Sequence, residues 1–171
     1  MIALKLLMSL AAAAAADPQT VPVDLDRYLG TWFEIARFDH RFERGCEDVT
    51  ATYTRRQNGD IGVVNSCAKG GKTKTISGHA WVPDPAVSGK LKVQFFWPFS
   101  APYWVLDLAP DYAWALVGSP DRSSCWILSR TPAISDELSR DLSARLRAKG
   151  FDPAKLIHVT QHARSAPVEA H

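Results

Sequence analysis

The three cysteines carry the most definite chemistry in this chain. Cys46, Cys67 and Cys125 leave one thiol over once a disulfide has formed, and disulfides persist in oxidising compartments. An Asn-Gly dipeptide in the segment 57–60 predicts a type I′ hairpin turn, and pairing residue 57 with residue 60 places Cys67 near Thr50. A bulge or bend after Cys46 would then bring Cys46 and Cys67 together. We predict this bridge, while a bridge from either cysteine to Cys125 stays open.

Carboxylates and histidines give weaker signals. Glu34 and Asp107 are expected to face inward, and a buried carboxylate can act as an acid or base, but neither has a visible partner. The five histidines are scattered, with only His158 and His162 close together, and no Cys/His spacing fits a metal site. We therefore predict no metal, no cofactor and no catalytic residue, and we expect the protein not to be an enzyme.

The unpaired thiol supports one alternative, an enzyme that acts on a hydrophobic substrate with Cys125 as its nucleophile. Cys125 alternates with Trp126 and so faces out if Trp126 faces in, which argues against this alternative. The sequence has neither a Gly-x-Ser-x-Gly elbow nor a phosphate-cradling loop.

Composition indicates one soluble domain. The chain has 171 residues, of which 46% are hydrophobic and 22% charged, enough to bury a sizeable core. Its formal net charge of +2 comes from acids and bases that are mixed along the chain. This pattern gives no basic footprint for nucleic acid, and we expect no nucleic-acid partner.

The N-terminal segment has the pattern of an export signal. Residues 1–16 comprise a short positive region, an apolar run too short to span a bilayer, and an Ala-x-Ala cleavage site. No cysteine precedes Cys46 to carry a lipoprotein anchor, so we expect a periplasmic or secreted protein. The domain is predicted over residues 17–162, and residues 163–171 are predicted to be a disordered tail.

Strand-like alternation recurs through the middle of the chain. Eight segments either alternate between apolar and polar residues or are apolar runs bounded by turn residues. They are 30–38, 48–56, 61–67, 73–82, 90–97, 103–108, 112–118 and 124–130. Joined in series by short turns, they predict an all-β fold, an eight-stranded antiparallel up-and-down β-barrel. The period then changes to about four, which predicts a C-terminal α-helix over 135–150 packed outside the barrel. An edge strand is expected at 155–161.

The first strand decides which side chains face the interior. Its alternation puts Trp32, Glu34, Ala36 and Phe38 on one face, and we assign that face inward because Trp32 is suited to plug the narrow end. The small residues at 78, 80, 113 and 115 favour a cavity over a filled core.

The loops of such a barrel emerge at alternate ends. Residues 39–45, 68–72, 97–102 and 119–123 would therefore share the open mouth. Residues 97–102 contain two prolines and are predicted to form a loop rather than a strand. Its Trp97 and Phe99 are candidates for contact with a membrane or for capping a ligand.

Three segments together resemble the lipocalin family. They are Gly30-Thr31-Trp32-Phe33-Glu34-Ile35-Ala36-Arg37, Arg41-Phe42-Glu43-Arg44-Gly45 and Trp126-Ile127-Leu128-Ser129-Arg130-Thr131-Pro132. The sequence is most similar to the bacterial outer-membrane lipocalins and to apolipoprotein D over nearly all of the mature chain. The resemblance implies a cup that binds fatty acids, lysophospholipids or other small hydrophobes. It also implies a structural signature of Gly30, Trp32 and Arg130, with Arg130 across the Trp32 indole at the closed end.

These expectations define a candidate ligand site. The inward positions expected to contact a ligand are Phe38, Tyr53, Ala80, Leu91, Val93, Phe95, Tyr103, Val105, Ala115, Val117 and Trp126. Arg41, Arg44 and Lys72 would form a basic rim that holds a fatty-acid carboxylate or a lipid phosphate, or else a merely solvated surface. We predict a protein that transports or sequesters such ligands in the cell envelope.

Overall fold

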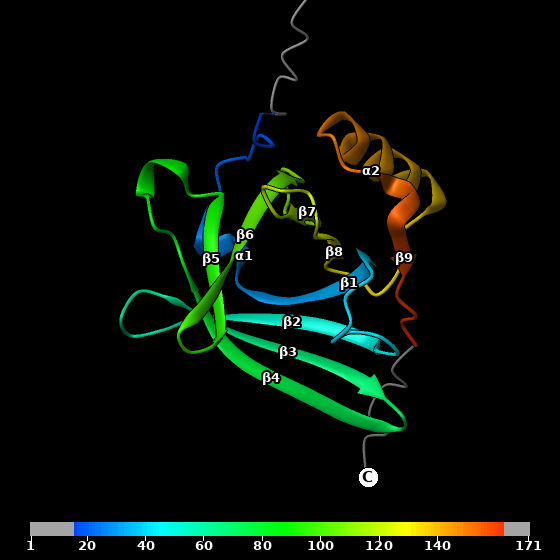
Figure 1. Cartoon of the computed structure of the whole chain (residues 1–171), viewed down its shortest axis with the longest axis horizontal. Coiled ribbons are helices and arrows are strands. Elements are labelled where there is room, and N and C mark those ends of the chain that lie inside the picture. The colour runs from blue at the N-terminus through cyan, green and yellow to red at the C-terminus, as the bar shows by residue number, and fades with distance from the viewer. Residues whose placement is uncertain (1–15, 163–171) are drawn as a thin grey trace, which may run out of the picture.

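An eight-stranded antiparallel β-barrel forms the centre of the protein, as a computed structural model that describes residues 16–162 shows (Figure 1). The strands are β1 (Gly30–Phe38), β2 (Glu47–Arg55), β3 (Ile61–Lys69), β4 (Lys72–Trp81), β5 (Lys90–Phe96), β6 (Phe99–Leu108), β7 (Trp114–Gly118), β8 (Cys125–Ser129) and the added β9 (Leu156–His158). Each strand from β1 to β7 pairs with the strand that follows it, β8 pairs with β1 to close the barrel, and β9 also pairs with β1. Except for Ala16, the predicted export signal and the predicted tail lie outside the described residues.

Helical segments occupy the ends and one side of the strands. They are α1 (Leu25–Tyr28), η1 (Pro85–Val87), α2 (Asp136–Ala148) and η2 (Pro153–Lys155). Ser135 caps α2, because its hydroxyl accepts a hydrogen bond from the Leu138 N–H at 3.1 Å. Within residues 16–162, no helix is long and apolar enough to cross a membrane.

Two apolar clusters lie on opposite faces of the strands. Val117 and Leu128 join Trp32 in the first cluster. Their neighbours Leu116 and Ile127 join the second, which also contains the buried leucines of α2. Because successive side chains of a strand point to opposite faces, α2 packs against the face that Trp32 does not occupy.

A bulge in β1 overturns part of the predicted inward face. The register with β8 shifts between Glu34 and Ala36, and both Ile35 and Ala36 join the second cluster. Side chains beyond the shift are therefore on the opposite face from the one that strict alternation predicts. Phe38 packs against Phe151, with ring centroids 6.3 Å apart, so its predicted inward facing was wrong.

The predicted 97–102 loop is instead the tip of a β-hairpin. β6 begins at Phe99, and Pro102 pairs with Lys92 of β5. The pairing of β6 with β7 starts only at Trp104. Pro102 therefore lies where one side of β6 has no strand to receive a hydrogen bond, which is where a strand tolerates proline.

The β2–β3 hairpin differs by one residue from the predicted register. Gly59 has φ +90°, but Asn58 is not among the residues with positive φ, so the turn is not type I′. The Arg56 N–H instead donates to the Asp60 carbonyl at 2.9 Å, which leaves three residues in the loop. The expected irregularity after Cys46 is present as a register shift between Glu47 and Thr50.

One arginine clamps the closed end of the barrel. The Arg130 guanidinium lies 3.8 Å from the centroid of the fully buried Trp32 ring. It also donates to the carbonyls of Thr31 at 3.0 Å and Arg27 at 2.9 Å. Gly30 has φ +96°, and a Cβ there would lie only 3.3 Å from the Arg130 Nη1 atom. A glycine at this position therefore leaves room for the clamp.

We expect Arg130→Ala to lower the free energy of unfolding by about 2 kcal/mol, because it removes a cation–π contact and two charge-assisted hydrogen bonds. Urea denaturation followed by tryptophan fluorescence measures this change. Arg140→Ala, at an exposed site on α2, is the matched control and should change stability little. Equal stability of the two variants would contradict the clamp.

Candidate functional site

The barrel encloses a cavity of about 170 Å³. Seven of the eleven predicted ligand positions line it: Tyr53, Ala80, Leu91, Val93, Phe95, Tyr103 and Trp126. They come from β2, β4, β5, β6 and β8, so the cavity runs along the inner face of most of the barrel. Aliphatic and aromatic side chains make up most of this wall, as a site for an apolar ligand requires.

The other four predicted positions do not line the cavity. Val105, Ala115 and Val117 have no exposed surface and pack in the cluster around Trp32. Phe38 lies on the opposite face of β1, for the reason given above.

Sequence reasoning missed several residues of the cavity. Leu25, Tyr28 and Leu29 reach it from α1 and the residue that follows α1. Strand alternation cannot identify them, but the helical pattern of residues 23–29 just before the first strand was an available signal. Glu34, which was predicted to face inward, also lines the cavity. The remaining lining residues that were missed are Phe42, Glu43, Ala51, Ile61, Val63, Asn65, Ala101, Pro102 and Leu128.

Three tyrosines share hydrogen bonds in the cavity wall. The Tyr103 hydroxyl lies 2.8 Å from that of Tyr28 and 2.9 Å from that of Tyr53. Burial raises the pKa of all three phenols, that of Tyr53 to about 12. The hydroxyls therefore remain protonated at neutral pH and satisfy one another.

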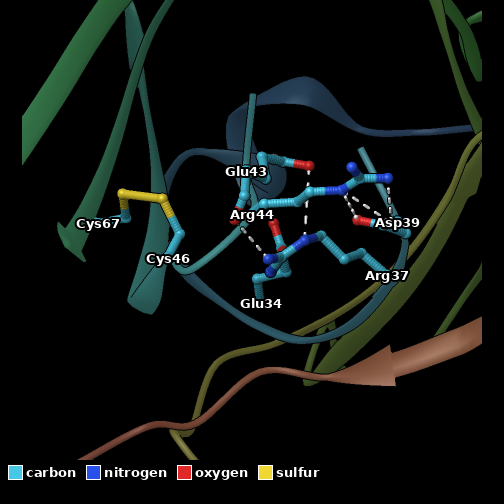
Figure 2. A network of polar contacts seen from close by, with 7 residues as sticks. All are labelled: Glu34, Arg37, Asp39, Glu43, Arg44, Cys46 and Cys67. Atoms are coloured by element: carbon cyan, nitrogen blue, oxygen red, sulfur yellow. Dashed lines mark hydrogen bonds and ion pairs between the residues drawn. A yellow bond between two sulfur atoms is a disulfide. The ribbon is translucent and has the colours of Figure 1, made fainter. Parts of the chain in front are cut away.

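The polar centre of the site is Arg37, which the bulge in β1 turns toward the interior (Figure 2). Its side chain is only 3% exposed. It donates to Glu34 Oε1 at 2.8 Å and to the backbone carbonyl of Glu43 at 2.7 Å. The Arg37 Nε and Glu43 Oε2 atoms are 3.7 Å apart, close enough for an ion pair but too far for a good hydrogen bond. We call Glu34, Arg37 and Glu43 the acid–arginine cluster.

The cluster is crowded with negative charge. Burial, reinforced by the Glu43 carboxylate, raises the pKa of Glu34 to about 8, against the opposing effect of Arg37. Burial also raises the pKa of Glu43, against Arg37 and a side-chain hydrogen bond from Trp126. Two carboxylates share one guanidinium, so the pair favours holding a proton.

Residues 39–46, which we call the mouth loop, are tied down at several points. Arg37 holds the Glu43 carbonyl from β1, and within the loop the Arg44 guanidinium forms three hydrogen bonds of 2.6–3.0 Å with the Asp39 carboxylate. The imidazole of His40 stacks on the indole of Trp126 at 5.0 Å. The loop is therefore fixed across the cavity wall rather than held away from it.

The predicted disulfide closes the end of this loop. Cys46 and Cys67 are bonded, with Cα atoms 5.4 Å apart, so the pairing is confirmed and the alternatives with Cys125 are excluded (Figure 2). The bond joins the last residue of the mouth loop to β3.

The predicted basic rim differs from a set of free cations. Arg44 is exposed, but its charge is paired with Asp39. Arg41 and Lys72 are exposed, and none of the three lines the cavity. Their role as head-group ligands stays a prediction.

The remaining thiol has none of the surroundings of a nucleophile. Cys125 is fully buried and packs in the second cluster, away from the cavity lining. Burial raises the pKa of the thiol to about 12, so the reactive thiolate is suppressed.

The acid–arginine cluster predicts a pH-dependent stability. Glu34 binds its proton more tightly in the folded chain than at its usual pKa of 4.5, so folding takes up a proton between about pH 4.5 and 8. The free energy of unfolding should therefore fall as pH rises through this window, by no more than about 1.4 kcal/mol per pH unit. Tyr53, Arg37 and Glu43 are the ionisable groups that act on this carboxyl.

Urea denaturation between pH 5 and 9 measures this slope. Glu34→Gln keeps a side-chain oxygen that accepts from Arg37 but removes the titratable carboxyl. The free energy of unfolding should then depend less on pH, and the variant should be more stable than the wild type at pH 9. Glu137→Gln, in an exposed position of α2, should keep the wild-type slope. An unchanged slope in Glu34→Gln would show that another group takes up the proton.

Comparison with known proteins places this geometry in a family. The sequence model of a protein family, described as a lipocalin-like domain, matches residues 23–161 of this chain. The outer membrane lipoprotein Blc of Escherichia coli K12 is 49% identical over 143 residues, covering 81% of this chain and 79% of Blc. Temperature-induced lipocalin-1 of Arabidopsis thaliana is 40% identical, with 85% and 82% covered. Bovine apolipoprotein D is 35% identical, with 78% and 74% covered.

Solved structures agree on the fold. Insecticyanin from the tobacco hornworm Manduca sexta superposes with a TM-score of 0.69 at 23% identity, covering 88% of this chain and 86% of insecticyanin. Lobster apocrustacyanin A1 superposes with a TM-score of 0.65 at 16% identity, with 81% and 79% covered. The chain belongs to the lipocalin family, whose fold is known for binding small hydrophobic ligands.

Proposed function

We propose that this lipocalin binds one acyl lipid, a fatty acid or a lysophospholipid, inside its barrel and transports or sequesters it in the cell envelope. The enclosed apolar cavity is the observation that carries the proposal. Burying each methylene of an acyl chain contributes about 0.8 kcal/mol, so even part of a chain supplies useful affinity after the ordering costs.

The placement of the helices supports a hollow interior. Leu142 and Leu146 of α2 are fully buried, but in the second cluster rather than in the one around Trp32. We infer that α2 covers the outside of the barrel. The interior is then left to the ligand instead of being filled by the helix.

The disulfide supports an envelope location. A bond between Cys46 and Cys67 forms and persists in an oxidising compartment such as the periplasm or the extracellular space. The Escherichia coli K12 relative is named an outer membrane lipoprotein. The expectation that this chain is periplasmic or secreted without a lipid anchor stays a prediction.

The competing hypothesis of an enzyme loses its candidate nucleophile. Cys125 neither lines the cavity nor favours the thiolate form. Binding therefore accounts for the site better than catalysis does.

Two adjacent valines of β3 allow a matched test of cavity binding. Val63 lines the cavity and is 3% exposed, whereas Val64 is 39% exposed. Affinities are measured by displacement of the fluorescent probe N-phenyl-1-naphthylamine. Val63→Phe should lower the affinities for palmitate and for lysophosphatidylcholine at least tenfold, because the added ring occupies the ligand's volume. Val64→Phe should leave both affinities within about twofold.

Overpacking at Val63 is expected to destabilise by about 1–3 kcal/mol, so urea denaturation must first confirm that the variant is folded. The wild type should displace the probe with both lipids. If neither lipid displaces it, or if the two variants bind alike, the ligand does not occupy this cavity.

We also propose that the β5–β6 tip contacts a membrane while a lipid enters or leaves. Phe96, Trp97 and Phe99 are 68%, 86% and 77% exposed. The segment from Val93 to Leu106 contains no charged residue. The tip borders the cavity, because Ala101 of the same hairpin lines it. Exposed aromatic rings favour the interface between lipid and water.

Replacing both Trp97 and Phe99 with Ser should reduce sedimentation with phosphatidylcholine–phosphatidylglycerol vesicles about tenfold or more, since each aromatic ring adds apolar area to the interface. The matched control replaces the partly exposed Val87 and Ile157, each 39% exposed, with Ser and should bind vesicles like the wild type. Equal vesicle binding by all three proteins would contradict a role for the tip.

A further inference from the structure

Two side-chain acceptors of cavity-lining residues, Glu43 Oε2 and Asn65 Oδ1, have no hydrogen-bond donor within the described structure. Glu34 and Glu43 both line the cavity, and the one guanidinium between them is Arg37. Two nitrogens of Arg37 are already used, on Glu34 Oε1 and on the Glu43 backbone carbonyl. The buried Glu43 Oε2 and Arg37 Nε atoms have no hydrogen-bond partner within the described structure.

A second unsatisfied acceptor belongs to the same wall. Asn65 lines the cavity from β3, and its buried Oδ1 also lacks a partner. A buried polar atom without a partner is unfavourable by about 1–3 kcal/mol, so natural structures rarely keep several together without a reason. Here the unsatisfied atoms of Glu43 and Asn65 come from cavity-lining residues, where a ligand can reach them.

We propose that the acid–arginine cluster, with Asn65, is a head-group site for acyl lipids whose polar end donates hydrogen bonds, as a hydroxyl or ammonium does, and that it disfavours a free carboxylate. This inference rests on the proposed function and selects among the lipids that the function leaves open. A donor would complete the unused acceptors. A carboxylate would instead add a third acid to two that already share one cation.

Other charges around the cavity do not reverse this preference. Among the residues described, no lysine, arginine or histidine lines the cavity. Arg44 is paired with Asp39, and burial lowers the pKa of His40, so that the imidazole stays neutral. Tyr53 faces Glu34 as a protonated phenol. The field at the site is therefore set by two carboxyls and Arg37.

The site also has an apolar neighbourhood suited to the rest of the ligand. Trp126 lines the cavity beside Glu43, and Phe42 lines it from the mouth loop. A lipid head held between them keeps its chain in contact with apolar wall residues such as Leu91 and Val93.

Three ligands with the same sixteen-carbon chain test the proposal. The head of 1-monopalmitoylglycerol has two hydroxyl donors, palmitate has a carboxylate, and methyl palmitate only accepts hydrogen bonds. The affinity of each ligand is measured by displacement of N-phenyl-1-naphthylamine from the folded wild-type protein at pH 9, because the Glu34 carboxyl, whose pKa burial raises to about 8, is then ionised. We expect the monoglyceride to bind at least tenfold tighter than palmitate, with the methyl ester in between.

Glu43→Gln and Glu34→Gln each remove one negative charge and keep the side-chain shape. Each should narrow the ratio of monoglyceride to palmitate affinity to below about threefold, chiefly by strengthening palmitate binding. Having two variants keeps the test valid if one of them misfolds. Glu47→Gln, at an exposed position of β2 outside the cavity lining, is the matched control and should keep the wild-type ratio.

The outcomes separate this inference from the proposed function. If all three ligands bind the wild type equally, or if palmitate binds tightest, the head-group site is wrong although the cavity still takes acyl chains. A wild-type ratio that persists in both glutamine variants also overturns the site. If none of the ligands displaces the probe, the proposed function itself fails.

Discussion

The bulge in β1 is the constraint on which the rest of the site depends. The bulge places both Ile35 and Ala36 on the outer face. Before it, Trp32 and Glu34 point to the interior, and after it Arg37 does so as well. A regular strand would have put Phe38 inside and Arg37 outside. Because of the bulge, the side chain that β1 points inward next to the mouth loop is the charged Arg37 instead of the aromatic Phe38.

Arg37 then links the cavity to its cover. A guanidinium that is only 3% exposed must be matched by acceptors, and it finds them on its own strand and on the mouth loop. Wall chemistry and loop position are therefore not independent. Any change that alters the charge of Glu34 or Glu43 also alters what holds the loop in place.

Much of the fold was predictable because it depends on local patterns. Alternation identified the eight strands, the change of period after them located α2, and the hairpin pairing with a bend after Cys46 led to the correct disulfide. The errors arose where one extra residue enters a strand or turn. The β1 bulge and the three-residue loop after Arg56 leave no clear mark in composition.

The candidate site was less predictable than the fold. Seven cavity residues followed from strand parity, but Glu43 lies in a loop and Arg37 follows a bulge, so neither could be assigned to the interior by counting. Pro102 misled for a different reason, because a proline excludes only a strand flanked on both sides. Positions that depend on the meeting of distant segments require the structure.

The seam between β1 and β8 has a consequence for how the molecule forms. It pairs Phe33 with Ser129, and Arg130 reaches back across it to Thr31, so the contact spans most of the chain. Loop-closure entropy makes such distant pairing slow compared with the local hairpins. The interior can exclude water only after this last seam has closed. A growing or truncated chain that lacks β8 would thus be a curled open sheet with an unpaired edge, and the enclosed cavity forms only once β8 has paired with β1.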